Sequence, residues 1–299
     1  MNALRAKLVA SVLRCAFAQL SEDVEEFHWE PNTLPERVSE NASSFAPLNL
    51  PGFVESVGHE GQWQPLRLVR EGRASVYMLE PYSPVKVPVV FVHGAGATAR
   101  AWRYFIEHLD ATRYQAWVYQ YPTGVPLDVS AQWLSNILGT LEGTLGFDRM
   151  IVVGHSMGGL LARRSVALNA GTTSARYALV TFSAPWGGVP LARFGVRLGR
   201  LAVPSWMDLV PDSAFLRVLQ TEPLAPTVPH HLFFAYRKDG DELDSDGMIS
   251  VSSQLETHIR RRAAGIYGFR AGHGAIVEDH SVFQRFAAIL SDLSTGGGG

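Results

Sequence analysis

The sequence has 299 residues, of which 46% are hydrophobic and 18% charged, with a formal net charge of −2. This balance excludes a disordered chain, which needs more charge and fewer apolar residues. The single cysteine, Cys15, excludes a fold held together by disulfides. The charge gives no reason to expect a nucleic-acid partner. No apolar run reaches the roughly 18 residues of a membrane-spanning helix.

The first 74 residues lack the regular pattern of the rest. The apolar run 8–13 follows two basic residues and precedes Ala16-Phe17-Ala18, the small-x-small spacing of a signal-peptidase site. The run is shorter than the roughly 7–15 residues of a secretory core and ends at Arg14, so we favour an amphipathic helix. Residues 19–74 predict an irregular arm with a strand over Trp63–Val69. Localisation stays open between the cytoplasm and the cell envelope or secretion.

From residue 75 onward, short apolar runs alternate with helical segments. The runs predict strands over 75–79, 87–92, 114–121, 150–154, 177–182, 231–236 and 265–269. Helices are predicted over 100–109, 130–145, 157–168 and 282–293. The apolar runs suit strands that are buried on both faces. The alternation predicts an α/β fold with a mostly parallel, doubly wound sheet over 75–293, followed by a flexible tail over 294–299.

A proline-rich segment over about 189–229 interrupts the alternation and predicts a helical cap insertion. Within it, Arg193, Arg197 and Arg200 fall at helical spacing beside apolar residues. This is the pattern of an amphipathic helix with a basic stripe. A mobile lid and a solvated surface helix both stay open as interpretations.

The strongest motif is Gly154-His155-Ser156-Met157-Gly158-Gly159. It follows a predicted buried strand and precedes a predicted helix, which is the context that a G-x-S-x-G nucleophile turn requires. Such a turn strains the backbone of Ser156 and exposes its hydroxyl. Glycine suits positions 154 and 158 because a side chain there would collide with the adjoining helix or strand. The helix N-terminus behind Ser156 favours developing negative charge.

With this motif the sequence resembles the α/β-hydrolase superfamily, and within it the bacterial lipase-like and esterase-like members. The resemblance implies a serine nucleophile whose acid and base follow it in the chain. It also implies an oxyanion hole formed by the backbone N–H groups of Ala95, after the motif His93-Gly94, and of Met157. His93 itself is interpreted as structural.

The resemblance places the general base in the loop that follows the strand 265–269. His273 lies there in a glycine-rich segment, before the last helix. His280, at the start of that helix, is the alternative. His230 and His231 begin a predicted strand and are poorly placed for this role.

The acid is expected in the carboxylate-rich segment 239–251. Asp246-Gly247 and the residues after it resemble the acid motif of bacterial lipases, which implies Asp246, with Asp244 as the alternative. A cluster of this kind also suits Ca²⁺. In lipases that carry calcium a second carboxylate closely follows the histidine, whereas Gly274 and Ala275 follow His273 here, so we predict neither metal nor cofactor.

These residues predict a serine hydrolase that cleaves carboxylic esters through an acyl-enzyme, as an esterase or lipase. An acyltransferase or thioesterase with the same triad, and a non-catalytic binding protein of this fold, are the alternatives. The expected partner is a small ester or a lipid, with peripheral contact to a lipid surface; the oligomeric state is not indicated. Candidate residues of an acyl pocket, or of packing within the insertion, are Trp186, Trp206, Met207 and Leu209.

Overall fold

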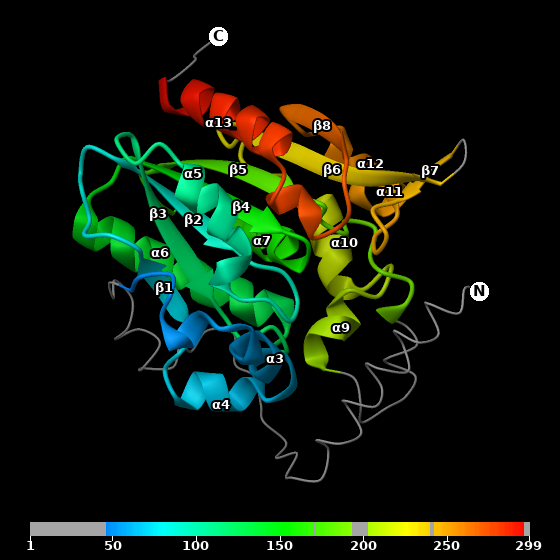
Figure 1. Cartoon of the computed structure of the whole chain (residues 1–299), viewed down its shortest axis with the longest axis horizontal. Coiled ribbons are helices and arrows are strands. Elements are labelled where there is room, and N and C mark those ends of the chain that lie inside the picture. The colour runs from blue at the N-terminus through cyan, green and yellow to red at the C-terminus, as the bar shows by residue number, and fades with distance from the viewer. Residues whose placement is uncertain (1–45, 170–171, 193–202, 240–241, 296–299) are drawn as a thin grey trace.

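The computed structural model describes residues 46–169, 172–192, 203–239 and 242–295 (Figure 1). The predicted N-terminal helix, Cys15 and the basic stripe of residues 193–200 lie outside the described residues. The order along the first half is η1 (Pro51–Phe53), α3 (Glu55–Trp63), α4 (Pro65–Arg70), β1 (Ser75–Met78), β2 (Val87–Val92), η2 (Ala99–Trp102), α5 (Arg103–His108), β3 (Tyr114–Gln120), α6 (Leu127–Leu145) and β4 (Arg149–His155). The second half continues with α7 (Met157–Asn169), β5 (Arg176–Phe182), α9 (Pro204–Asp208), α10 (Ala214–Thr221), β6 (His230–Asp239), β7 (Glu242–Ser245), α11 (Val251–Gln254), α12 (Thr257–Arg260), β8 (Gly265–Arg270), η4 (Ala275–Val277) and α13 (His280–Thr295).

The described strands form one sheet in the order β1-β3-β2-β4-β5-β6-β7, with β8 also paired to β6. Strand β2 runs parallel to both β3 and β4, and the parallel pairing continues through β5 and β6 to β8. Only the pairings of β1 with β3 and of β7 with β6 are antiparallel among the described strands. The predicted α/β class with a mostly parallel sheet is confirmed.

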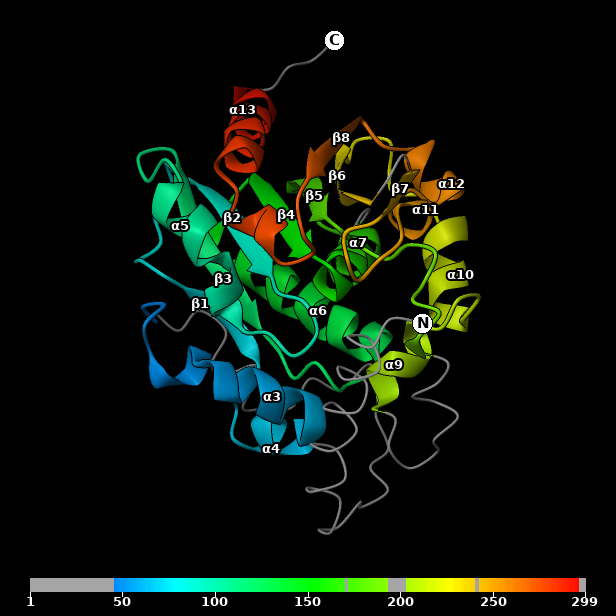
Figure 2. The same cartoon turned by 45° about the vertical axis from the view of Figure 1, so that its right-hand side comes forward.

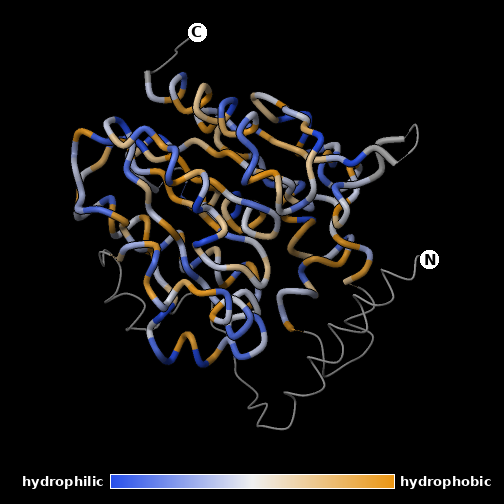
Figure 3. The backbone as a smooth tube through the Cα atoms, viewed as in Figure 1, coloured by the Kyte–Doolittle hydropathy of each residue, from blue (hydrophilic) through white to orange (hydrophobic). Residues whose placement is uncertain are grey.

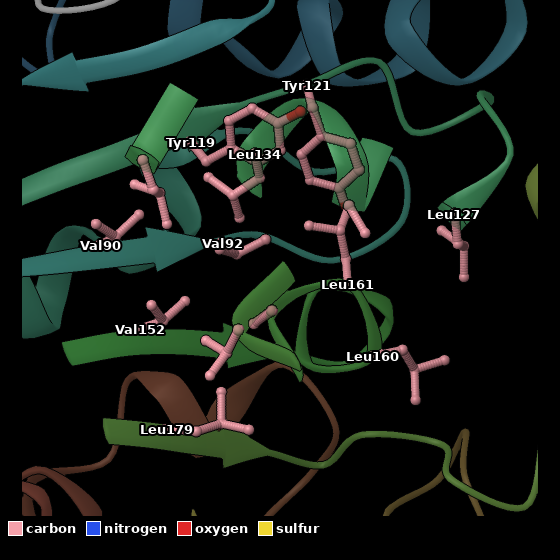
Figure 4. Close-up of a cluster of buried hydrophobic side chains, with 14 of the residues drawn as sticks. Val90, Val92, Tyr119, Tyr121, Leu127, Leu134, Val152, Leu160, Leu161 and Leu179 are labelled. Carbon is pink, nitrogen blue, oxygen red and sulfur yellow. The ribbon is translucent and has the colours of Figure 1, made fainter. Parts of the chain in front are cut away.

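Helices cover both faces of the sheet, with α5 and α13 on one face and α6 and α7 on the other (Figures 1 and 2). Alternate residues of each central strand therefore enter different cores. Val90 and Val152 pack against α6 and α7 (Figure 4), whereas Phe91 and Val153 pack against α5 and α13. This double burial explains the apolar runs, and Figure 3 shows the hydrophobic colour along the central strands.

The predicted strand over Trp63–Val69 is wrong, because this segment forms the end of α3 and the helix α4. Pro65 occupies the first turn of α4, where its missing N–H breaks no helical hydrogen bond. In α3 the buried residues are Val57, Gly58 and Gly61. Their spacing is that of one helix face, and two of the three are glycines, so the apolar pattern is too weak to read.

Several further elements differ from the predicted ones. Helix α6 begins at Leu127, before the expected residue 130, because the Asp208 carboxylate accepts its N–H at 2.7 Å. Strand β7 was not predicted; it is a polar segment paired with the end of β6. Helix α13 extends to Thr295, past the predicted end at 293.

The parallel strands bring the loops after β2, β4 and β8 to the same edge of the sheet. The segment between β5 and β6, where the cap insertion is expected, contains α9 and α10 among its described residues. None of the described helices combines the length and apolar character needed to cross a membrane.

Two buried histidines make the stability of this fold depend on pH. Burial lowers the pKa of His93 to about 4 and that of His230 to about 3, whereas an unfolded histidine has a pKa of about 6.5. The unfolded state therefore binds more protons below that pH. The contribution of these histidines to the free energy of unfolding is at its full value above about pH 6.5 and falls as the pH decreases toward 4. We expect a loss whose slope approaches about 1.4 kcal/mol per pH unit for each histidine once the pH is well below 6.5, measured by urea denaturation between about pH 7 and pH 5.

The variant His230→Gln supplies the control for this prediction. Its amide places a polar atom near the position of Nε2, which lies 2.8 Å from Thr181 Oγ1, and it does not titrate. The slope of stability against pH should therefore be smaller in the variant by the contribution of one histidine. Identical slopes in wild type and variant would contradict the prediction.

Candidate active site

Ser156 occupies a sharp turn between β4 and α7. Its φ is +55°, a left-handed backbone conformation that residues other than glycine rarely adopt. Its N–H donates to Phe182 O at 2.8 Å. A Cβ at Gly154 would lie 2.5 Å from Gly158 O, and one at Gly158 would collide with the carbonyl oxygen of His93. The glycines on either side of Ser156 thus allow the helix and two strands to meet behind it.

His273 connects Ser156 to Asp246 by two short hydrogen bonds. Its Nδ1 lies 2.6 Å from Asp246 Oδ2, and its Nε2 lies 2.8 Å from Ser156 Oγ. Because an ionised carboxylate only accepts, Nδ1–H is the donor toward Asp246. Nε2 is then free to accept the hydroxyl hydrogen of Ser156. This is the arrangement that activates a serine as a nucleophile.

Asp246 is fully buried, and the hydrogen bonds that its carboxylate accepts favour the ionised form. Burial alone would raise its pKa, but the hydrogen bond and charge of His273 and the N–H groups of Ile249 and Met248 hold the pKa below its ordinary value. These two N–H groups donate to Oδ1 at 2.7 and 2.9 Å. The carboxylate is therefore charged at neutral pH, with Oδ2 directed at His273.

The backbone of His273 is held on two sides. Its N–H donates to Asp246 O at 3.0 Å, and its carbonyl accepts from His155 Nε2 at 2.8 Å. Burial is the larger and the charge of the neighbouring His273 the smaller cause that lowers the pKa of His155 to about 3. His155 is therefore neutral, and it carries its proton on Nε2, which donates to the His273 carbonyl. His155, directly before the nucleophile, thus anchors the loop after β8 that carries His273.

The loop after β2 lies directly against the nucleophile. A Cβ at Gly94 would lie 3.1 Å from Ser156 Cβ, a tight contact, so glycine suits this close approach of the backbone. The next N–H, that of Ala95, makes no hydrogen bond within the described part of the chain. Met157 is the first residue of α7, and its N–H has no partner inside the helix. The N–H groups of Ala95 and Met157 are therefore without a partner in the described structure, and their role as oxyanion donors stays a prediction.

The alternative acid and base lie elsewhere or are not described. His280 begins α13, and its Nδ1 lies 3.0 Å from the Tyr104 hydroxyl. His230 and His231 lie at the start of β6, as expected. Asp244 lies in β7, and its side chain is outside the described part of the structure.

The four candidate pocket residues do not share one environment. Trp186 and Leu209 are buried in the core beside α6 and α7. Trp206 packs edge-on against Trp63 at 5.4 Å, and Met207 is 57% exposed. None of the four lines the two cavities of about 390 and 350 Å³ found elsewhere in the described structure. Their role in an acyl pocket stays a prediction.

Two buried polar side chains near the site carry no motif and were not singled out from the sequence. Gln254 is fully buried and holds the acid segment, since its Nε2 donates to Ile249 O and to Ala235 O. Thr123 accepts the N–H of Gly96 at 3.1 Å in the loop after β2. Only their tertiary contacts identify them. Among the described residues, no group of His, Cys, Asp and Glu is arranged to hold a metal ion.

Comparisons with known proteins agree with this architecture. A sequence profile of the alpha/beta hydrolase family matches residues 89–293. The fold is similar to that of a mature Bacillus licheniformis lipase, with 17% identity, a TM-score of 0.56 and coverage of 72% of this chain and 97% of that chain. It is also similar to a butyrate-bound esterase of Thermogutta terrifontis, with 15% identity, a TM-score of 0.50 and coverage of 75% and 91%. A Listeria innocua gene product gives 17% identity, a TM-score of 0.51 and coverage of 69% and 94%. The comparison with curated proteins found no match.

At these identities the structural likeness shows the fold alone, whereas the profile match covers more than half of the chain. The matched residues run from within β2 through the turn of Ser156 into the last turn of α13 and contain every candidate site residue. The resemblance stated from the sequence is confirmed, and the match supports hydrolase activity. The chain belongs to the alpha/beta hydrolase family.

Proposed function

We propose that the protein is a serine hydrolase of carboxylic esters, an esterase or lipase that acts through an acyl-enzyme. The observation that carries this proposal is the hydrogen-bonded series Ser156, His273 and Asp246, at distances of 2.8 and 2.6 Å. The N–H groups of Ala95 and Met157, unpartnered within the described residues, support the proposal as the expected oxyanion donors. A protein of this fold that only binds a ligand has no need of all these features together.

In the proposed reaction, Ser156 Oγ attacks the acyl carbon while His273 Nε2 takes the hydroxyl proton. The substrate oxygen becomes negative and receives hydrogen bonds from the N–H groups of Ala95 and Met157. Each such donor lowers the barrier by about 2.7–4 kcal/mol. His273 then gives its proton to the leaving alcohol, and the acyl group stays on Ser156. Water, deprotonated by His273, releases the acid and restores the hydroxyl.

Asp246 stabilises the histidine cation that forms in each step and fixes the proton on Nδ1. No metal or cofactor enters this scheme, because the nucleophile, the base and the oxyanion donors all come from the chain itself.

Ser156→Ala removes the nucleophile and leaves the expected oxyanion donors, the N–H groups of Ala95 and Met157, in place. We expect kcat for p-nitrophenyl butyrate to fall by about 10⁵–10⁶-fold, because water would have to attack without covalent catalysis. Circular dichroism and the unfolding temperature should stay close to those of wild type. A variant with near-normal turnover would exclude Ser156 as the nucleophile.

Asp246→Asn tests the acid. The amide nitrogen would donate toward His273 Nδ1 and force the ring proton onto Nε2, which could then no longer accept from Ser156. We expect kcat to fall by about 10⁴-fold. Asp244→Asn is the matched control and should stay within about twofold of wild type. Loss of activity in the control instead would assign the acid to Asp244.

The acyl chain length separates the substrate classes that the site allows. We expect turnover of p-nitrophenyl acetate, butyrate, octanoate and palmitate, with a preference for an apolar acyl group over a charged one. Activity that rises at an oil–water interface would favour a lipase, and a higher kcat/KM for matched thioesters would favour a thioesterase. No turnover of any ester or thioester, with no transfer to an added alcohol, would exclude acyl chemistry at this site.

A further inference from the structure

Helix α3 contacts the loop that carries the expected oxyanion donor. A Cβ at Gly58 would collide with the carbonyl oxygen of Gly96 and would lie 2.8 Å from that of Ala97. The helix backbone reaches this loop only because position 58 has no side chain. Figure 2 shows α3 below the sheet, at the side of β1 and β3. This helix precedes the residues that match the family profile.

The same helix and the loop after β3 enclose Gly96 from two directions. Gly96 has φ +65°, and a Cβ there would lie 2.6 Å from Gln62 Oε1. Its N–H donates to Thr123 Oγ1 at 3.1 Å. The loop that carries Thr123 is tied in turn to α3, because Gly124 N–H donates to Gly61 O at 3.0 Å. The left-handed turn at Gly96 is therefore fixed by groups on both elements.

A third attachment lies just beyond this turn. The buried Thr98 hydroxyl donates to Phe53 O at 2.7 Å, and the Arg100 guanidinium donates to Asn49 O at 2.9 Å. The segment before α3 thus holds the far end of the loop. Residues 46–63 therefore contact the loop at Gly96, Ala97, Thr98 and Arg100.

Ala95 lies between these two fixed points. On one side Gly94 rests against Ser156, and on the other Gly96 is held by α3 and Thr123. The direction of the Ala95 N–H follows from the backbone angles of these neighbours. We propose that α3 positions the oxyanion donor, and that Gly58 and Thr123 are positioning residues for the reaction. This inference rests on the proposed function.

Gly58→Ala tests the contact directly. The added methyl group must displace the Gly96 carbonyl, and a shift of about 1 Å in a catalytic group can lower the rate about 100-fold. We expect kcat to fall by about 10–100-fold with KM within about threefold, since the loss concerns the transition state. The inhibition constant of a trifluoromethyl ketone, whose adduct with Ser156 places a negative oxygen in the same site, should weaken in parallel. Gly52→Ala, where a Cβ would meet no atom within 4 Å, is the control and should match wild type.

Thr123→Val and Thr123→Ser test the same proposal without a new steric contact. Valine removes the acceptor for the Gly96 N–H at nearly equal volume, whereas serine keeps it. We expect the valine variant to lose kcat by about tenfold and the serine variant to recover most of it. Rates are expressed per active site titrated by the burst of p-nitrophenol, so that partial unfolding does not imitate the effect. This pair decides the question if Gly58→Ala does not fold.

Each outcome bears on a different claim. An active wild type with kcat and ketone inhibition unchanged in both Gly58→Ala and Thr123→Val would overturn the inference alone. A wild type that neither turns over esters nor reacts with a serine-directed phosphonate would overturn the proposed function, and the inference with it. A lower unfolding temperature with unchanged kcat per active site would show that α3 serves stability only, and would overturn the positioning role.

Discussion

The hydrogen bond between Asp246 and His273 is the interaction on which the candidate site depends. Removing a carboxylate from water costs several kcal/mol unless it is paired, and Asp246 is fully buried with Oδ2 only 2.6 Å from His273 Nδ1. The pairing joins the acid segment to the loop after β8 and leaves Nε2 directed at Ser156. His155 holds the same loop from the opposite side. If this bond is removed, nothing fixes the proton of His273 on Nδ1 or directs its Nε2 at Ser156.

Much of the fold and the centre of the site could be predicted because they rest on local patterns. Apolar runs that enter two cores are readable as strands, and the strand–turn–helix around Ser156 has a motif with a steric reason for each glycine. The order of the parallel strands then places the loops that carry His273 and Ala95 at the same edge of the sheet as Ser156. The choice of Asp246 over Asp244 came from resemblance to a family motif, since several carboxylates share that segment.

The parts that could not be predicted depend on contacts between distant segments. Helix α3 was expected as part of an irregular arm because Gly58 and Gly61 replace the large apolar residues that normally mark a buried helix face. The early start of α6 depends on the Asp208 carboxylate, 81 residues away in sequence. Thr123 is an ordinary loop residue until Gly96 is placed beside it. Polar side chains that satisfy one distant backbone group leave no periodic signal.

The proposed nucleophile can be tested most directly by trapping it and locating the modified residue. The wild-type protein is treated with a p-nitrophenyl alkylphosphonate, and the intact mass and the peptide that spans residues 149–163 are measured by mass spectrometry. We expect one phosphonyl group per chain, on Ser156, with none on the Ser156→Ala protein. A wild-type protein that stays unmodified, or that carries the group on another residue, would contradict this assignment.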